Sequence, residues 1–166
     1  MDNNMNNMNN SMDNDIYNSS YNVSNILNIL EKYGITIKNM MDCGMELCIS
    51  NDNLNNIRKK LEEIILKNLN NPNVSTLIIG AIKLEEEGIK GNLPFNYNED
   101  PNYIYVDEVI GMAIANEIAG TKAIFNFKWY DAKKPGIVGA LDKKGYVFLD
   151  DAIAGFIAGC MSKVFE

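Results

Sequence analysis

The sequence predicts an all-α protein, a compact bundle of about seven short helices that follows a disordered N-terminal tail. Apolar residues beyond position 22 recur nearly throughout at the three- and four-residue spacing of helices. Glycine, proline and asparagine separate these segments, as expected at the ends of short helices. The chain has 166 residues, of which 46% are hydrophobic and 22% charged, which suffices for one domain with a sizeable core.

The first 22 residues differ in composition from the rest of the chain. They are mainly Asn, Met, Ser and Asp, with few side chains to bury, so folding cannot offset their ordering entropy. We expect residues 1–22 to be disordered and residues 23–166 to form a single helical domain. Asp13-Asn14-Asp15 resembles the DxD motif of aspartyl phosphatases, but that motif follows a buried strand, and here only asparagine-rich sequence precedes it.

We predict four helices in the first half of the chain. Ser24 caps the first, which stops at Gly34, and Thr36 caps the second. Pro72 suits the start of the fourth, which ends near Gly88. The third carries apolar residues at the i, i+3, i+4, i+7 spacing, namely Leu54, Ile57, Leu61, Ile64, Ile65 and Leu69. Core packing is the simplest explanation of all four apolar stripes.

A connecting loop is expected in the middle of the chain. Residues 88–103 contain two prolines, two glycines and several asparagines. Tyr103–Val106 has the composition of a short extended segment. Further helices are then expected at about residues 107–118, 122–130 and 150–165, with a looser segment at 131–148.

Charge and histidine content exclude several classes of function. The formal net charge is −7, and Arg58 is the only arginine, whereas binding to nucleic acid or anionic membranes requires clustered Lys and Arg. We therefore expect no nucleic-acid partner. The sequence contains no histidine, which removes Ser-His-Asp and Cys-His catalysis and every His-ligated zinc site.

The chain is expected to be soluble and cytoplasmic. Cys43, Cys48 and Cys160 form an odd set without a CxxC pair, which indicates free thiols in a reducing compartment. No apolar run reaches the ~18 residues of a membrane span, so we expect no transmembrane segment. The first residues lack the basic and apolar regions of a signal peptide.

Acidic residues cluster in the last third of the chain. Asp107-Glu108 opens one predicted helix and Asp150-Asp151 opens another, while Asp131 and Asp142 lie between them. Two carboxylate pairs at helix starts offer the oxygen ligands that a hard cation such as Mg²⁺ prefers, and nearby lysines could neutralise a phosphate. Acidic residues are also favoured in the first turn of any helix by the helix dipole, so this purely structural explanation stays open here.

Two other features concern helix packing. Glu117 falls in the middle of the apolar face of its predicted helix, where an isolated charge is costly. We expect Glu117 to be paired within the fold rather than catalytic, although a metal ion or an interface in a homo-oligomer would also satisfy it. Ala154-Gly155 and Ala158-Gly159 place small residues four apart, which permits close helix approach. Such an approach would bring Asp150-Asp151 near a second acidic helix end.

The last third also contains three motifs in a fixed order. They are Asp107-Glu108-Val109-Ile110-Gly111, then Phe127-Lys128-Trp129-Tyr130-Asp131 with Lys134-Pro135, then Leu149-Asp150-Asp151-Ala152-Ile153-Ala154-Gly155. The phosphatidylglycerophosphatase A family carries DE-x-x-G, F-R-x-x-D-x-x-K-P and LDD-x-x-AG in this order, and the chain resembles it over about Tyr103 to Phe165. Lys128 replaces the family's usual arginine, and Ile137 replaces a common second proline.

The first half narrows this resemblance. Leu30-Glu31-Lys32-Tyr33-Gly34-Ile35-Thr36 and Met41-Asp42-Cys43-Gly44-Met45-Glu46-Leu47 are similar to the soluble archaeal branch of the family. That branch includes α-ribazole phosphatases of the cobamide (vitamin B12) pathway. The resemblance therefore implies a Mg²⁺-dependent phosphoric monoester hydrolase that removes the 5′-phosphate of a small substrate, α-ribazole 5′-phosphate or a cobamide phosphate.

The resemblance also implies roles for individual residues. The ligands of Mg²⁺, direct or through water, would be Asp107, Glu108, Asp150 and Asp151. Asp131 would orient the attacking water or accept its proton, while Lys128 and Lys134 would bind phosphate oxygens as point charges. An aspartyl-phosphate intermediate is the alternative route, because carboxylates can act as nucleophiles.

Two other functions stay open. Hydrolysis of phosphatidylglycerophosphate in phospholipid synthesis would need a nonpolar groove or a membrane-binding face, which the sequence does not reveal. A non-catalytic helical module that binds a phosphorylated ligand through a retained acidic site is the other alternative. The substitutions at Lys128 and Ile137 leave room for such a module.

Overall fold

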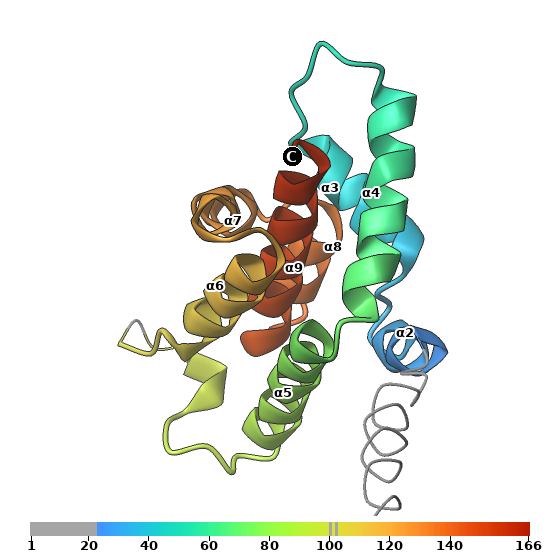
Figure 1. The fold of residues 1–166 in the computed structure, drawn as a ribbon. Helices are drawn as coiled ribbons and strands as arrows, with labels where there is room; N and C mark the ends of the chain where they lie inside the picture. Colours follow the sequence, from blue (N-terminus) through green and yellow to red (C-terminus); the bar gives the residue numbers. More distant parts are fainter. Residues whose placement is uncertain (1–22, 100, 102) are drawn as a thin grey trace, which may run out of the picture.

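The computed structural model describes residues 23–99, 101 and 103–166, so the expected disordered tail lies outside the described residues. The described residues form eight α-helices and one 3₁₀ turn and include no strand, which confirms the all-α prediction with one helix more than expected (Figure 1). The elements are α2 (Val23–Glu31), α3 (Ile37–Glu46), α4 (Leu54–Leu69), α5 (Pro72–Ile89), η1 (Tyr97–Glu99), α6 (Val106–Ala119), α7 (Thr121–Lys133), α8 (Gly136–Asp142) and α9 (Phe148–Val164).

Helix α9 is the centre of the fold. Every residue of α9 except Lys163 is buried, and the helix contacts α3, α4, α5, α6, α7 and α8. Figure 1 shows α9 in red with the other helices arranged around it. A helix that is apolar on all sides needs such surroundings. The consequence for function is that its two acidic residues, Asp150 and Asp151, are buried as well.

Small residues allow α6 and α9 to pack closely. A Cβ atom placed on Gly111 would lie 2.7 Å from the carbonyl oxygen of Asp151, and one placed on Gly155 would overlap the backbone of Gly111. A Cβ on Gly159 would press against Ile118 at 2.9 Å. The prediction that glycines in the last helix permit close approach is confirmed, and it is α6 that approaches.

The helix caps of the first half follow the sequence signals in part. Thr36 caps α3 through a capping box, in which its hydroxyl accepts from the Asn39 N–H and the Asn39 side chain accepts from the Thr36 N–H. Pro72 stands at the start of α5, as predicted. Helix α2 begins at Val23, so Ser24 lies inside the helix rather than at its cap.

The second half departs from the sequence predictions in three places. Helix α8 occupies part of the expected loose segment, because its seven residues are too few to establish a period in the sequence. Helix α7 continues to Lys133 instead of ending at Tyr130. The expected extended segment at Tyr103–Val106 is a turn and loop up to Tyr105, and Val106 is already the first residue of α6. None of the described helices combines the length and the apolar character that crossing a membrane would require.

The burial predicted for Glu117 is wrong. Glu117 is exposed, together with Val109 and Ala113, because α6 buries the opposite side of the helix. The expected partner within the fold does exist, since Glu117 Oε1 accepts a hydrogen bond of 3.2 Å from the Asn73 side chain. The carboxylate that is fully buried on an apolar helix face is instead Glu85 of α5.

Candidate functional site

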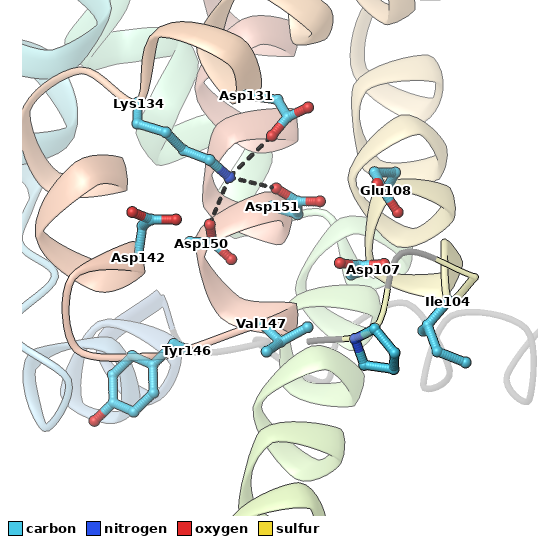
Figure 2. A pocket seen from close by; sticks show the side chains of 11 residues that line it. Ile104, Asp107, Glu108, Asp131, Lys134, Asp142, Tyr146, Val147, Asp150 and Asp151 are labelled. Carbon is cyan, nitrogen blue, oxygen red and sulfur yellow. Dashed lines mark hydrogen bonds and ion pairs between the residues drawn. The ribbon is translucent and has the colours of Figure 1, made fainter. Parts of the chain in front are cut away.

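A cavity of about 310 Å³ lies where the N-termini of α6 and α9 meet the C-terminal end of α7. Its polar lining consists of Asp107, Glu108, Asp131, Lys134, Asp142, Asp150 and Asp151. Figure 2 shows Lys134 reaching in from the end of α7, with Asp107 and Glu108 presented by α6 on the facing side. Six carboxylates and one lysine make this an anionic cavity with a single cationic side chain in it.

Glu85 fixes the N-terminus of α9. One carboxylate oxygen accepts from the Val147 N–H at 3.2 Å, and the other accepts from Phe148 at 2.9 Å and Leu149 at 2.8 Å. The first N–H groups of a helix have no partner inside the helix, so this carboxylate from α5 serves as their cap. Because Glu85 takes these N–H groups, a phosphate cannot use them, and Lys134 is the cationic group left in the cavity lining.

Lys134 is held in a backbone conformation that few side chains adopt. Its φ is 47° and its ψ 53°, in the left-handed region, immediately after α7 ends. Such a conformation costs on the order of 1–3 kcal/mol for a residue other than glycine. It directs the side chain into three ion pairs, at 2.7 Å to Asp150, 2.9 Å to Asp131 and 3.2 Å to Asp151. The strain therefore occurs at the lysine that joins the carboxylates.

Three of the carboxylates form a group that could hold a cation. Asp107, Glu108 and Asp151 each offer one oxygen, and these oxygens all lie within 4.8 Å of one another. Among the described residues, Asp107 Oδ1, Glu108 Oε2 and Asp150 Oδ1 are buried without a hydrogen-bond partner. A buried carboxylate oxygen without a partner is costly, and a hard divalent cation with oxygen ligands would satisfy Asp107 and Glu108, the two of these residues that belong to the converging group.

The pKa values of the cluster reflect crowding in a buried place. Burial, and then the adjoining Glu108 carboxyl, raise the pKa of Asp107 to about 7. Burial and the charge of Asp150 raise the pKa of Asp151 to about 8, while burial raises that of Asp150 to about 6 against the opposing effect of Lys134. Burial alone would lower the pKa of Lys134, but Asp150 and Asp151 outweigh it and hold the pKa above its usual value.

The structure brings together six of the seven residues singled out from the sequence. The residues that line the cavity are Asp107, Glu108, Asp131, Lys134, Asp150 and Asp151. Lys128 is the exception, since it is exposed on α7 and does not line the cavity. Where the family usually has an arginine, this chain has Lys128, and that lysine does not line the cavity that holds the carboxylates.

Sequence reasoning missed Glu85, although a signal was available. Ile78, Ala81, Ile82 and Glu85 are spaced i, i+3, i+4, i+7 and share the buried face of α5. A carboxylate that is buried on an apolar helix face needs a partner, and the residue in this position is Glu85 rather than Glu117. Tyr146 and Val147 also line the cavity and carry no sequence motif that would have identified them.

Fold and site together define an all-α protein with a cluster of carboxylates in one cavity. These carboxylates offer a place for a cation, and the lysine beside them could bind an anion. The chain belongs to the phosphatidylglycerophosphatase A family, whose family model matches residues 61–166. An uncharacterized protein of Methanocaldococcus jannaschii is 72% identical over 127 residues, which are 76% of this chain and all of that protein. Membership of the family indicates phosphatase activity.

Solved structures share the fold. A protein of unknown function from Bacillus stearothermophilus superposes with a TM-score of 0.74 and 22% identity, covering 86% of this chain and 92% of that one. Protein ypjQ from Bacillus subtilis superposes with a TM-score of 0.72 and 24% identity, again covering 86% of this chain and 92% of that one. The low temperature requirement C protein from Listeria monocytogenes superposes with a TM-score of 0.71 and 24% identity, covering 86% of this chain and 94% of that one. At these identities the similarity concerns the fold alone.

Proposed function

We propose that this protein is a Mg²⁺-dependent phosphomonoesterase that removes the 5′-phosphate of α-ribazole 5′-phosphate in cobamide biosynthesis. The observation that carries the proposal is the position of Lys134. Its ammonium group joins Asp131, Asp150 and Asp151, and it faces Asp107 and Glu108 across the cavity (Figure 2). A divalent cation and a cationic side chain each stabilise the charge on a phosphomonoester, and this cavity offers a place for the cation next to Lys134.

The carboxylates would divide between two tasks. Asp107, Glu108 and Asp151 would hold Mg²⁺, with Asp150 beside them, because oxygens of the first three converge. Asp107 and Glu108 each also have a buried oxygen without a protein partner. When bound, Mg²⁺ would polarise the phosphate and lower the pKa of a coordinated water. The three ion pairs of Lys134 keep its ammonium group charged and positioned, and it would exchange one of these carboxylates for a phosphate oxygen when the substrate binds.

Asp131 is the residue we assign to proton transfer. It is half-buried at the edge of the cavity, and its Oδ1 lies 2.9 Å from Lys134 Nζ. In the reaction, a bond forms between the water oxygen and phosphorus while the bond from phosphorus to the alcohol oxygen breaks. Asp131 would take the proton from the water, and that proton would pass to the leaving alkoxide. Nucleophilic attack by a carboxylate remains the alternative route.

The choice of substrate rests on the resemblance of the first half to the archaeal branch. The relative that is 72% identical is itself archaeal, which agrees with this part of the resemblance. The activity for which the family is named makes phosphatidylglycerophosphate the second candidate. Both candidates share the phosphomonoester group and differ in what it is attached to, so a direct comparison decides between them.

The test measures phosphate release from α-ribazole 5′-phosphate and from short-chain phosphatidylglycerophosphate, with Mg²⁺ or with EDTA. We expect turnover of the first substrate, its loss in EDTA, and its loss in Asp151→Asn. Asp52→Asn, which changes an exposed carboxylate far from the cavity lining, is the matched control and should retain full activity. Preference for the lipid would overturn the substrate assignment. Binding of both phosphates without turnover of either would identify a non-catalytic module.

A further inference from the structure

A second cavity adjoins the site. It has a volume of about 270 Å³ and shares Asp142, Tyr146 and Val147 with the first cavity. These three residues therefore form the border between the carboxylate cluster and the second space. Figure 2 shows Asp142 and Tyr146 on the side of the site away from Asp107 and Glu108. A phosphomonoester whose phosphate lies at Lys134 has room on this side for the group attached to its ester oxygen.

The second cavity differs chemically from the first. Tyr97, Asn98, Lys144 and Tyr146 contribute to its lining, and of the two tyrosines Tyr146 is partly exposed while Tyr97 is buried. A partly exposed tyrosine ring packs against planar groups, while an amide and an ammonium group hydrogen-bond to hydroxyl and ring-nitrogen acceptors. This combination suits a polar molecule that contains a flat ring. The two acyl chains of a phospholipid would meet charged or polar groups at Asp142, Asn98 and Lys144.

Contacts within the protein hold the rings of Tyr97 and Tyr146 in place. The Tyr97 hydroxyl donates to the Gly145 carbonyl at 2.9 Å, and the Tyr97 ring stacks on Phe148 with centroids 6.4 Å apart. Gly88 makes room for this ring, since a Cβ there would overlap it. The Tyr146 ring meets Tyr33 edge-on at 6.0 Å. Walls that are in place before binding reduce the entropy lost when a ligand is ordered.

We propose that the second cavity is the subsite for the organic part of the substrate, and that this part is a heterocyclic ring carried by a sugar. Lys144 and Asn98 would recognise its polar atoms, and Tyr146 would contact it where the two cavities meet. This proposal rests on the proposed phosphomonoesterase function. It extends that function by naming the residues that select the alcohol rather than the phosphate.

Two variants test the subsite without touching the carboxylate cluster. Lys144→Ala removes a polar contact, and Ile89→Trp fills the rim from an exposed position, which spares the core. With α-ribazole 5′-phosphate as substrate, we expect KM to rise about tenfold in Lys144→Ala, a change typical of losing one good polar contact. In Ile89→Trp we expect a rise of similar size, because the indole ring would occupy space that the substrate needs. With glycerol 1-phosphate, which has no ring, we expect kcat/KM to change less than twofold. Lys143→Ala, at an exposed neighbouring position outside the cavity, should change neither.

A binding measurement separates this proposal from the proposed function. Calorimetric titration with α-ribazole, which lacks the phosphate, reports on the subsite alone. Binding to the wild type that weakens about tenfold in Lys144→Ala supports the subsite even if no phosphate ester is hydrolysed. Hydrolysis that Lys144→Ala and Ile89→Trp leave unchanged, or impair equally for both esters, overturns the subsite and leaves the phosphatase assignment standing.

Discussion

The carbonyl oxygen of Gly111 occupies the place where any side chain at position 155 would begin. Helices α6 and α9 consequently touch backbone to backbone one turn after their acidic residues, and a Cβ on Gly111 would likewise approach Asp151. This contact sets the distance between Asp107-Glu108 and Asp150-Asp151. The carboxylates therefore converge because Gly111 and Gly155 let the two helices approach, and not only because acidic residues stand at the helix starts.

The first prediction concerns this contact. Gly155→Ala should destabilise the fold by about 3 kcal/mol or more, because backbone atoms of α6 cannot move aside as a flexible side chain would. Gly80→Ala is the matched control, since Gly80 is also inside a helix but has no atom within 4 Å of an added Cβ. It should stabilise the fold by about 1 kcal/mol through helix propensity. Urea unfolding measures both changes, and equal effects of the two variants would contradict the role of the close contact.

The second prediction concerns Glu85. Glu85→Gln should destabilise the fold by about 1–3 kcal/mol, since glutamine offers one acceptor oxygen and places an NH₂ group against backbone N–H donors of α9. It should also weaken Mg²⁺ binding, because the start of α9 carries Asp150 and Asp151. Glu62→Gln, at an exposed position of α4, is the control and should alter neither quantity. Denaturant titration and Mg²⁺ calorimetry provide the two readouts. Unchanged Mg²⁺ affinity in a folded Glu85→Gln would refute the positioning role.

The sequence located the two acidic pairs and indicated the close helix approach that brings them to one cavity. Asp107-Glu108 and Asp150-Asp151 were expected at helix starts near one another, and glycine spacing in the last helix supplied the reason. Helical periodicity likewise located most of the helices, because amphipathic burial leaves a regular pattern. The convergence of the two acidic pairs was thus predictable from local sequence.

Long-range contacts were harder to predict. Glu85 and Glu117 both lie on helices with apolar neighbours, and only the packing of α5 and α6 decides which carboxylate is buried. The exposure of Lys128 depends on the rotation of α7, which its short apolar pattern does not define. Helix α8 follows Pro135 and begins at Gly136, two residues that indicate a loop when the sequence is read alone.

The third prediction distinguishes two neighbouring lysines. Lys134→Met should reduce kcat/KM for a phosphomonoester by a factor of about 100 or more, since removing one group that stabilises developing charge typically has this effect. Lys133→Met removes the same charge from an exposed position next to it and should change kcat/KM less than twofold. Steady-state phosphate release measures both. Similar losses in the two variants would mean that net charge matters rather than the cavity position of Lys134.

The fourth prediction concerns pH in the absence of divalent cations. The pKa of Asp107 is raised to about 7 and that of Asp151 to about 8, mainly by burial, whereas in the unfolded chain both groups have ordinary values near 3.8. Between these values the folded protein holds more protons than the unfolded chain. The free energy of unfolding must then fall as pH rises from about 4 through 8, the reverse of a carboxylate in a simple salt bridge.

Mg²⁺ should reverse this trend, because it replaces the protons that the clustered carboxylates would otherwise retain. In EDTA we expect Tm to fall by roughly 5 °C between pH 5.5 and pH 8. With Mg²⁺ present, the rise in Tm should be larger at pH 8 than at pH 5.5. The double variant Asp107→Asn/Asp151→Asn serves as reference for every other titrating group, and its Tm should depend less on pH and respond less to Mg²⁺. A wild-type pH profile that matches this reference would show that the carboxylates are not proton-linked, and a Mg²⁺ response equal at both pH values would argue against cation binding at this cluster.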